Sequence, residues 1–181
     1  MKELNSYITE KLKINKETLN HKYHPKDKDS LKKLIERLLK ERGKDADFND
    51  IDVSSITDME TLFYKLDPHN IDISEWDMSH VENLEWMFYY CDNFNCDISN
   101  WDISHVKNMQ YTFCGCNKFN CDISNWDASN VENFEYTFSG CKTLDCDLNK
   151  WNPKHITNKI YTFRDSLIES NGDLPKWWLK P

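Results

Sequence analysis

The 181-residue chain has few glycines and no long apolar run, and each shortage excludes a class of protein. Its 4 glycines are too few for a collagen-like or glycine-rich linker sequence. No stretch approaches the ~18 consecutive apolar residues that a membrane-spanning helix needs, and the first residues lack the apolar segment that directs secretion. We therefore expect a cytoplasmic protein whose 7 cysteines are reduced thiols.

Charge is distributed unevenly along the chain. Residues 1–45 contain 13 basic and 8 acidic residues, a net +5, whereas residues 46–181 contain 10 basic and 23 acidic residues, a net −13. The mean hydropathy of −0.80 is low, but 7 Trp, 8 Tyr and 9 Phe are enough to build a core. Because an acidic body repels phosphate groups, nucleic acid is excluded as a partner, and nothing indicates a membrane partner.

A period of 25 residues dominates the sequence. Complete units occupy 72–96, 97–121 and 122–146, a degraded unit follows at 147–172, and a partial unit precedes them at 51–70. The recurring positions include Trp76, Trp101, Trp126 and Trp151; Phe63, Phe88, Phe113, Phe138 and Phe163; and Asp58, Asn83, Asn108, Asn133 and Asn158. Repeats of this length cannot bury an apolar face alone, so they are expected to stack as the coils of a solenoid.

Each unit has the pattern of short extended pieces followed by a helical turn. Apolar and polar residues alternate from Phe94 to Ile98, which is typical of a half-buried strand. Tyr111 to Phe113 lead to Gly115, which suits a short helical turn closed by glycine. With coils at ~4.8 Å spacing, the extended pieces are expected to pair as a parallel sheet, giving a β-solenoid.

The repeated motif also resembles a known family. The unit D-I-S-x-W-D-x-S-x-V-x-N, with F-x-x-C following, is similar to the BspA-like leucine-rich repeats. More narrowly, it resembles a 25-residue repeat of unknown function found in mycoplasmas, in Bacteroides, in phages and in large viruses. The resemblance covers about residues 48–172. It implies a leucine-rich-repeat-like right-handed solenoid, a role in protein binding or adhesion, and no catalysis.

The N-terminal part is predicted to be helical. Residues 29–43 form an amphipathic pattern with Asp29 or Ser30 as N-cap and Gly43 as C-cap. The apolar stripe contains Leu31, Leu34, Ile35, Leu38 and Leu39. A second helix is predicted over Ser6 to Ile14. We divide the chain into a helical N-terminal cap (1–47), the repeat region (48–172) and a C-terminal cap stub (173–181); a partner-binding helix is the alternative role for the first segment.

Several polar and sulfur columns follow the same period. Cysteines at 91, 116 and 141, and at 96, 121 and 146, are interpreted as core filling, with disulfides or a zinc site as alternatives. Aspartates at 72, 97, 122 and 147, and at 52, 77, 102 and 127, are predicted to cap backbone amides, with a calcium ladder as the alternative. The Asn column is expected to bond turn backbone, and His80, His105 and His155 are expected at surface turns.

No local motif of an enzyme is present, because nucleophile-elbow, phosphate-loop, zinc-protease and dinucleotide patterns are all missing. We expect a non-enzymatic protein–protein interaction module without cofactor or metal, presenting a repeated acidic face. The candidate contacts are Glu75, Glu82, Glu85, Lys107, Gln110, Tyr111, Glu132, Glu135 and Tyr136. A surface or secreted adhesin and a virion or self-assembling component are the alternatives. The Asn- and Lys-rich composition favours a phage or intracellular bacterial protein.

Overall fold

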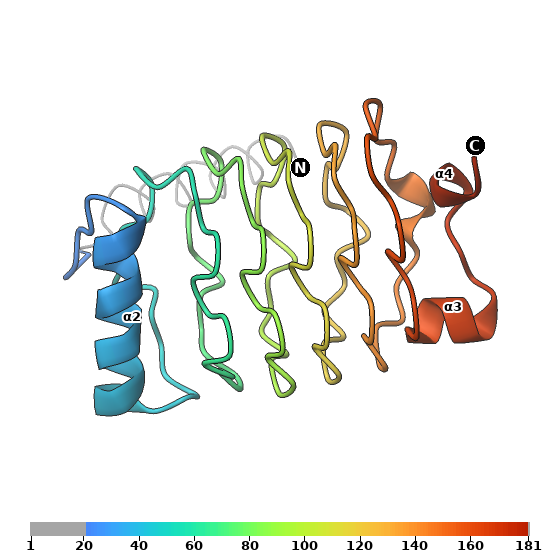
Figure 1. Cartoon of the computed structure of the whole chain (residues 1–181). Coiled ribbons are helices and arrows are strands. Elements are labelled where there is room, and N and C mark those ends of the chain that lie inside the picture. The colour runs from blue at the N-terminus through green and yellow to red at the C-terminus, as the bar shows by residue number, and fades with distance from the viewer. Residues whose placement is uncertain (1–20, 181) are drawn as a thin grey trace, which may run out of the picture.

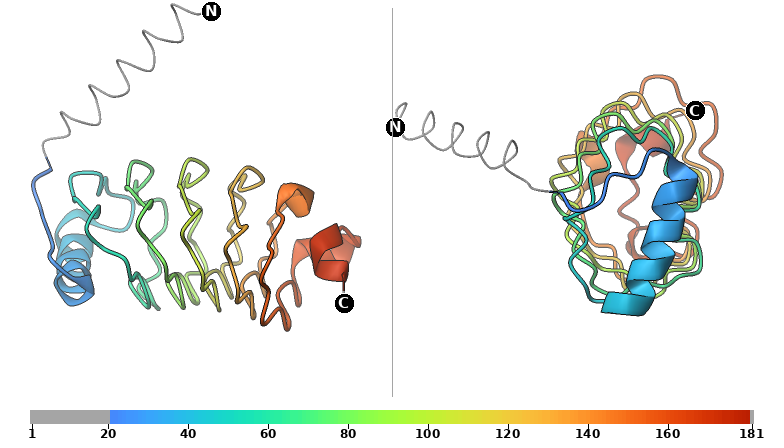
Figure 2. Two further views of the ribbon diagram at one scale, coloured as in Figure 1. Left: turned by 90° about the horizontal axis from the view of Figure 1, so that it is seen from above. Right: turned by 90° about the vertical axis from the view of Figure 1, so that its left-hand side faces the viewer.

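The computed structural model describes residues 21–180, so the helix predicted over Ser6 to Ile14 lies outside the described part. The repeat units follow one another as stacked coils, with α2 across one end and α3 and α4 at the other (Figure 1). The helices are α2 (Lys28–Arg42), the 3-10 helix η1 (Leu148–Lys150), α3 (Leu167–Asn171) and α4 (Lys176–Leu179). The view along the stack shows the coils superposed behind α2 (Figure 2).

The predicted β-solenoid is wrong, because residues 21–180 contain no β-strand. The β-type pairing recorded between consecutive units in this range consists of isolated parallel bridges, which link Tyr23 to Ile51, Asp47 to Asp72, and the column Asp58, Asn83, Asn108, Asn133 and Asn158. The segment from Phe94 to Ile98 does alternate between buried and exposed residues. It forms no ladder, since the Ile98 N–H donates to Cys121 Sγ (3.3 Å) and not to a neighbouring carbonyl.

The expected helical turn over 111–115 is also wrong, and tight turns take its place. From Met109 to Gly115, every second residue donates its N–H to a carbonyl of the next coil, as Tyr111 does to the Glu135 carbonyl (2.9 Å). The residues between donate three positions back, as Cys114 does to the Tyr111 carbonyl (3.3 Å). Tyr111 has φ 55° and Gly115 has φ 78°. Positive φ is incompatible with a right-handed helix, which explains why the predicted helical turn does not form here.

Helix α2 matches the prediction for 29–43 apart from its start. The N-cap is Asp27, not Asp29 or Ser30, because the Asp27 carboxylate accepts from the Ser30 N–H (2.8 Å) and Ser30 Oγ accepts from the Asp27 N–H (3.1 Å). This reciprocal pair is a capping box. The helix ends at Gly43, as predicted, with φ 89°. Leu31, Ile35 and Leu38 are buried in the core that the coils share.

Side-chain donors connect each coil to the preceding one. The indole N–H of each Trp in the column donates to a buried carbonyl 28 residues earlier, as Trp101 does to Ile73 (3.1 Å). The thiol of Cys116 donates in the same way to the Phe88 carbonyl (3.0 Å), and the hydroxyl of Thr137 to the Met109 carbonyl (2.9 Å). These bonds satisfy carbonyls that the absent strands leave without a ladder partner.

The aromatic columns are stacked through the core. Neighbouring rings in the Phe column stand 5.3 to 5.7 Å apart and nearly parallel. Trp177 of α4 extends the Trp column, because its ring stacks on Trp151 (6.3 Å) and its N–H bonds the Leu148 carbonyl (3.0 Å). The degraded last unit is thereby covered by an aromatic residue of the C-terminal segment. No helix within residues 21–180 is long and apolar enough to cross a membrane.

Candidate binding face

A row of partly exposed aromatic rings runs along the stack, and we call Trp86, Tyr111, Tyr136 and Tyr161 the aromatic row. They occupy the same position in consecutive units, with φ between 52° and 58°. Trp86 and Tyr111 stack at 4.5 Å, Tyr111 and Tyr136 at 4.7 Å, and Tyr136 and Tyr161 lie 5.0 Å apart. Bulky residues rarely adopt left-handed backbone, so the row combines local strain with ring stacking.

More rings extend the row toward α2. Tyr89 contacts Trp86 (4.4 Å), stacks on Tyr64 (5.6 Å) and meets Tyr90 edge-on (4.4 Å). Burial raises the pKa of Tyr89 to about 12, so its hydroxyl stays protonated at neutral pH. Ile160 (56%), Tyr90 (53%) and Tyr161 (49%) are exposed large apolar side chains of this surface. Gly115 fits beneath the Tyr90 ring, where a Cβ would stand 3.0 Å from Tyr90 Cδ1.

Two carboxylates border the aromatic row and are held by neutral donors. Glu85 accepts from the indole N–H of Trp86 (2.9 Å) and from the amide of Asn108 (2.9 Å). Glu135 accepts from the amides of Gln110 (2.8 Å) and Asn158 (2.8 Å). Among residues 21–180, no basic nitrogen lies within 4.0 Å of either carboxylate. Their charges are therefore oriented but not neutralised by a cation of the described chain.

The first unit shows the same columns with a cation in place. Asp58 and Glu60 precede Thr61 as Asn83 and Glu85 precede Trp86. Lys28 of α2 donates to Asp58 (2.6 Å) and to Glu60 (2.8 Å). Lys32, one helical turn later, donates to the Thr61 carbonyl (3.0 Å). Here an ammonium group on a packed segment contacts both carboxylates, whereas Asn takes the place of Asp58 in the later units.

The Asn column fixes the backbone of this face, which confirms the prediction for it. Asn83, Asn108 and Asn133 each accept the N–H of the residue two positions later at 3.0 Å. These residues are Glu85, Gln110 and Glu135, so the same turn orients each polar side chain of the face. The amide donors of the column reach back to the preceding coil, as Asn108 does to Glu85.

The predicted contact residues are only partly brought together. Glu85, Gln110, Tyr111, Glu135 and Tyr136 lie on this face. Glu82, Lys107 and Glu132 form a separate exposed column, in which Lys107 pairs with Glu82 (2.8 Å). Their hydrogen bond and opposite charges lower the pKa of Glu82 and raise that of Lys107. Glu75 is exposed at a different turn of its coil, beside Ser74.

Sequence reasoning missed the two ends of the aromatic row, Trp86 and Tyr161. The 25-residue period was a sufficient signal, because both residues share the column of Tyr111 and Tyr136. Burial and the negative charge of Glu135 raise the pKa of Tyr111.

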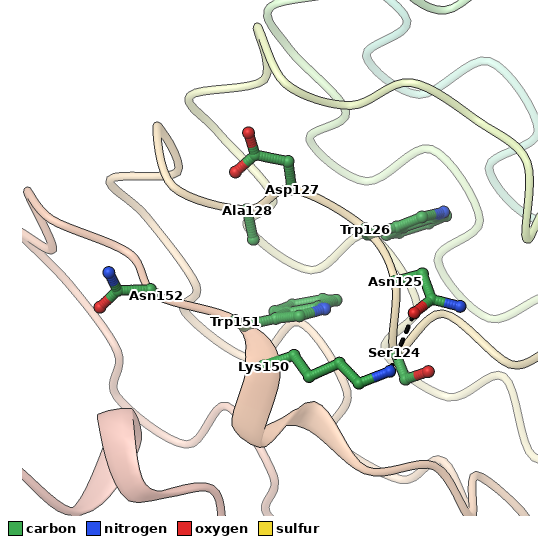
Figure 3. A pocket seen from close by; sticks show the side chains of 8 residues that line it. All are labelled: Ser124, Asn125, Trp126, Asp127, Ala128, Lys150, Trp151 and Asn152. Atoms are coloured by element: carbon green, nitrogen blue, oxygen red, sulfur yellow. Dashed lines mark hydrogen bonds between the residues drawn. The ribbon is translucent and has the colours of Figure 1, made fainter.

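A second feature is a hollow of about 270 Å³ between the coil of residues 122–146 and the coil of residues 147–172 (Figure 3). Trp126 and Trp151, whose rings stack at 6.2 Å, line it together with Ala128. Lys150 bridges its edge by donating to Asn125 (3.0 Å). Ala128 takes the place of Met78 and Ile103 in earlier units, so the hollow arises where the column has its smallest side chain.

The aspartate and histidine columns have the predicted roles. Asp97 Oδ1 accepts the N–H (3.1 Å) and hydroxyl (2.7 Å) of Ser99, and these bonds lower its pKa. Equivalent amide bonds occur at the other aspartates of both columns. His80, His105 and His155 are exposed at or beside turns. In the described range, no group of three or more His, Cys, Asp or Glu is arranged to hold a metal ion.

All 7 cysteines are free thiols, and the 6 of the two columns are packed in or against the core, as predicted. Cys91, Cys96, Cys116 and Cys141 are buried, and Cys114, Cys121 and Cys146 are half-buried. Burial raises the pKa of Cys91 to about 12 and that of Cys114 to about 11. Thiols with such pKa values are poor nucleophiles at neutral pH.

Comparison with known proteins places the repeat in a family. The model of a family described as "Mycoplasma protein of unknown function, DUF285" matches residues 30–141 and 97–180. No curated protein and no solved structure matches the chain. The two matched ranges overlap and together run from residue 30 to residue 180, across α2, every repeat unit and the C-terminal helices. The chain therefore belongs to the DUF285 family.

Proposed function

We propose that this chain is a non-enzymatic binding module that contacts a protein partner through the aromatic row and the carboxylates of Glu85 and Glu135. The observation that carries the proposal is the recurrence of one partly exposed aromatic position on four consecutive units. Tyr and Trp are enriched in the energetically dominant part of protein interfaces, because they bury large areas at a small entropy cost. The resemblance to BspA-like repeats supports a binding role.

The face is organised before any partner arrives. Ring stacking fixes the aromatic row, and amide hydrogen bonds fix both carboxylates. A preorganised surface loses little conformational entropy on association. Equivalent side chains on successive coils also suit a partner segment that runs along the stack and contacts several units in turn.

A cytoplasmic location remains our prediction. The free thiols support it, because half-buried Cys114, Cys121 and Cys146 are more easily kept reduced in a reducing compartment. Export to the cell surface would instead favour the adhesin alternative.

Affinity capture from the native host tests the proposal. The intact protein is compared with a face variant, Glu85→Gln/Glu135→Gln, and with a matched control, Glu75→Gln/Asp145→Asn, which removes the same charge from exposed positions elsewhere. We expect a protein that wild type and control retain and the face variant loses. Equal retention by the face variant would overturn the proposal. Capture of nothing, together with concentration-dependent assembly of the chain itself, would favour the self-assembling alternative.

A further inference from the structure

We propose that the partner element recognised by this face is an extended basic peptide, with Lys or Arg residues placed on Glu85 and Glu135. The inference rests on the proposed function and specifies the chemistry of the ligand. It is carried by four observations: an internal precedent, uncompensated charge, the orientation of the rings and the spacing of the carboxylates.

The internal precedent is the contact between α2 and the first unit. Lys28 binds Asp58 (2.6 Å) and Glu60 (2.8 Å), which occupy the columns of Asn83 and Glu85. The hydrogen bonds to Asp58 and Glu60 raise the pKa of Lys28 against the effect of its partial burial, so the ammonium form is stabilised there. The chain thus shows that its own columns accept a lysine from a segment packed beside them.

Two later units carry the carboxylate of the Glu60 column without the cation, at Glu85 and Glu135, and in both units Asn replaces Asp58. Glu85 and Glu135 accept hydrogen bonds only from neutral amides and an indole among the bonds of residues 21–180. Residues 46–181 carry a net charge of −13, so the surrounding field also favours a positive partner. Charge-assisted hydrogen bonds are about twice as strong as neutral ones, and a Lys or Arg would add them without displacing the existing donors.

The orientation of the rings favours a peptide over a carbohydrate. Sugar rings bind proteins by lying flat on an exposed aromatic face. Within the aromatic row the faces are covered, because Trp86 stacks on Tyr111 and Tyr111 on Tyr136 with interplanar angles of 24° and 8°. On the Tyr161 ring, Arg164 lies 5.0 Å from the centroid. The row therefore presents ring edges, which suit the methylene groups of Lys, Arg and Pro side chains.

The spacing of the carboxylates selects a repeat in the ligand. Glu85 and Glu135 lie two coils apart, which corresponds to about 10 Å at the usual separation of hydrogen-bonded chains. A polyproline II helix advances about 9.3 Å in the three residues of one turn, and residues three apart share a face. Basic residues at every third position of such a peptide would therefore meet Glu85 and Glu135 in turn.

A synthetic probe tests this inference on the full chain. The probe is a fluorescent peptide of four Arg-Pro-Pro triplets, and its neutral counterpart has Gln in place of Arg. We expect wild type to bind the Arg peptide, to bind the Gln peptide at least about tenfold more weakly, and to lose affinity as salt increases. The face variant Glu85→Gln/Glu135→Gln should bind the Arg peptide about tenfold more weakly, whereas the control Glu75→Gln/Asp145→Asn should retain its affinity.

Charge reversal provides the second arm. A Glu85→Lys/Glu135→Lys variant should lose the Arg peptide and gain binding of a Glu-Pro-Pro peptide of the same length. The inference is overturned if the face variant binds the Arg peptide as wild type does, if the Gln peptide binds equally well, or if soluble cellohexaose displaces the probe. Native capture that depends on the face, without Arg-peptide binding, would overturn this inference and leave the proposed function standing. If neither native capture nor binding of the Arg peptide depends on Glu85 and Glu135, both the proposed function and this inference are rejected.

Discussion

Filling the hollow beside Ala128 should stabilise the protein. Ala128 is 1% exposed, as are Met78 and Ile103 at the same position of earlier units. At Ala128 a hollow of about 270 Å³ adjoins the position, and the rings of Trp126 and Trp151 line it (Figure 3). An Ala128→Ile substitution would therefore place apolar carbons into existing space, in a backbone setting that already accepts isoleucine one unit earlier.

The expected gain follows from the added apolar groups. Each buried CH₂ contributes about 0.8 kcal/mol, so the added carbons contribute at most about 2.4 kcal/mol. Loss of isoleucine rotamer freedom costs about 0.5–1 kcal/mol. The net increase in the free energy of unfolding should be about 1.5 kcal/mol, which corresponds to a rise in Tm of about 3–6 °C for a chain of this size.

Urea denaturation followed by tryptophan fluorescence measures this difference. The reciprocal variant Ile103→Ala is the control, because it removes apolar carbons from a buried position and should lower the free energy of unfolding by about 2–5 kcal/mol. A loss of stability in Ala128→Ile, together with the expected loss in Ile103→Ala, would refute the reasoning. It would show that the hollow results from the spacing of the coils and is not space left by a missing side chain.

Three further predictions concern the columns. The lowered pKa values of Asp97 and Asp122 mean that their stabilisation is complete above about pH 4 and is lost as the pH falls through those lowered values. The urea midpoint of Asp97→Asn/Asp122→Asn, whose side chains still accept hydrogen bonds, should therefore fall less steeply on acidification than that of wild type, and identical slopes would contradict this role. Because burial raises the pKa of Cys114 to about 11, its alkylation at pH 8 should be much slower in the native protein than in urea, as mass spectrometry would show; equal rates would contradict its burial. Deletion of residues 97–121 should join equivalent positions of adjacent units, so we expect cooperative thermal unfolding by circular dichroism, and a broad or absent transition would argue against interchangeable units.

The repeat, the buried columns and helix α2 could be predicted because they depend on side-chain periodicity. Trp101 and Phe113 recur with the period and are buried, and the stripe of Leu31, Ile35 and Leu38 faces the core. The strands could not be judged from the same pattern. Phe94 to Ile98 alternates as a strand does, but Cys121 Sγ and not a carbonyl meets the Ile98 N–H, and a side-chain partner of this kind is invisible in periodicity.

The aromatic row was only partly predictable for a different reason. Tyr111 and Tyr136 could be selected as contacts because they repeat beside variable polar residues. Their positive φ values could not be inferred, since bulky side chains seldom adopt that region and the neighbouring coil stabilises it here. The assignment of Glu75 and Glu82 to the same surface as Glu85 followed from shared charge, whereas the turns between them direct these side chains to different parts of the coil.

The alternating hydrogen bonds between coils also explain why the helices at the two ends matter. The hydrogen bonds of the type that Tyr111 donates to the Glu135 carbonyl all point from one coil to the next. One end of the stack therefore presents donors of this type and is complementary to the acceptors of the other end. Contacts of this head-to-tail kind do not close on themselves and lead to open filaments when they join separate molecules. With α2 across the first coil and Trp177 of α4 against the last unit, each end is occupied. The terminal helices therefore lie where they would block end-to-end polymerisation, and the number of units between them sets the length of the aromatic row and of the proposed binding face.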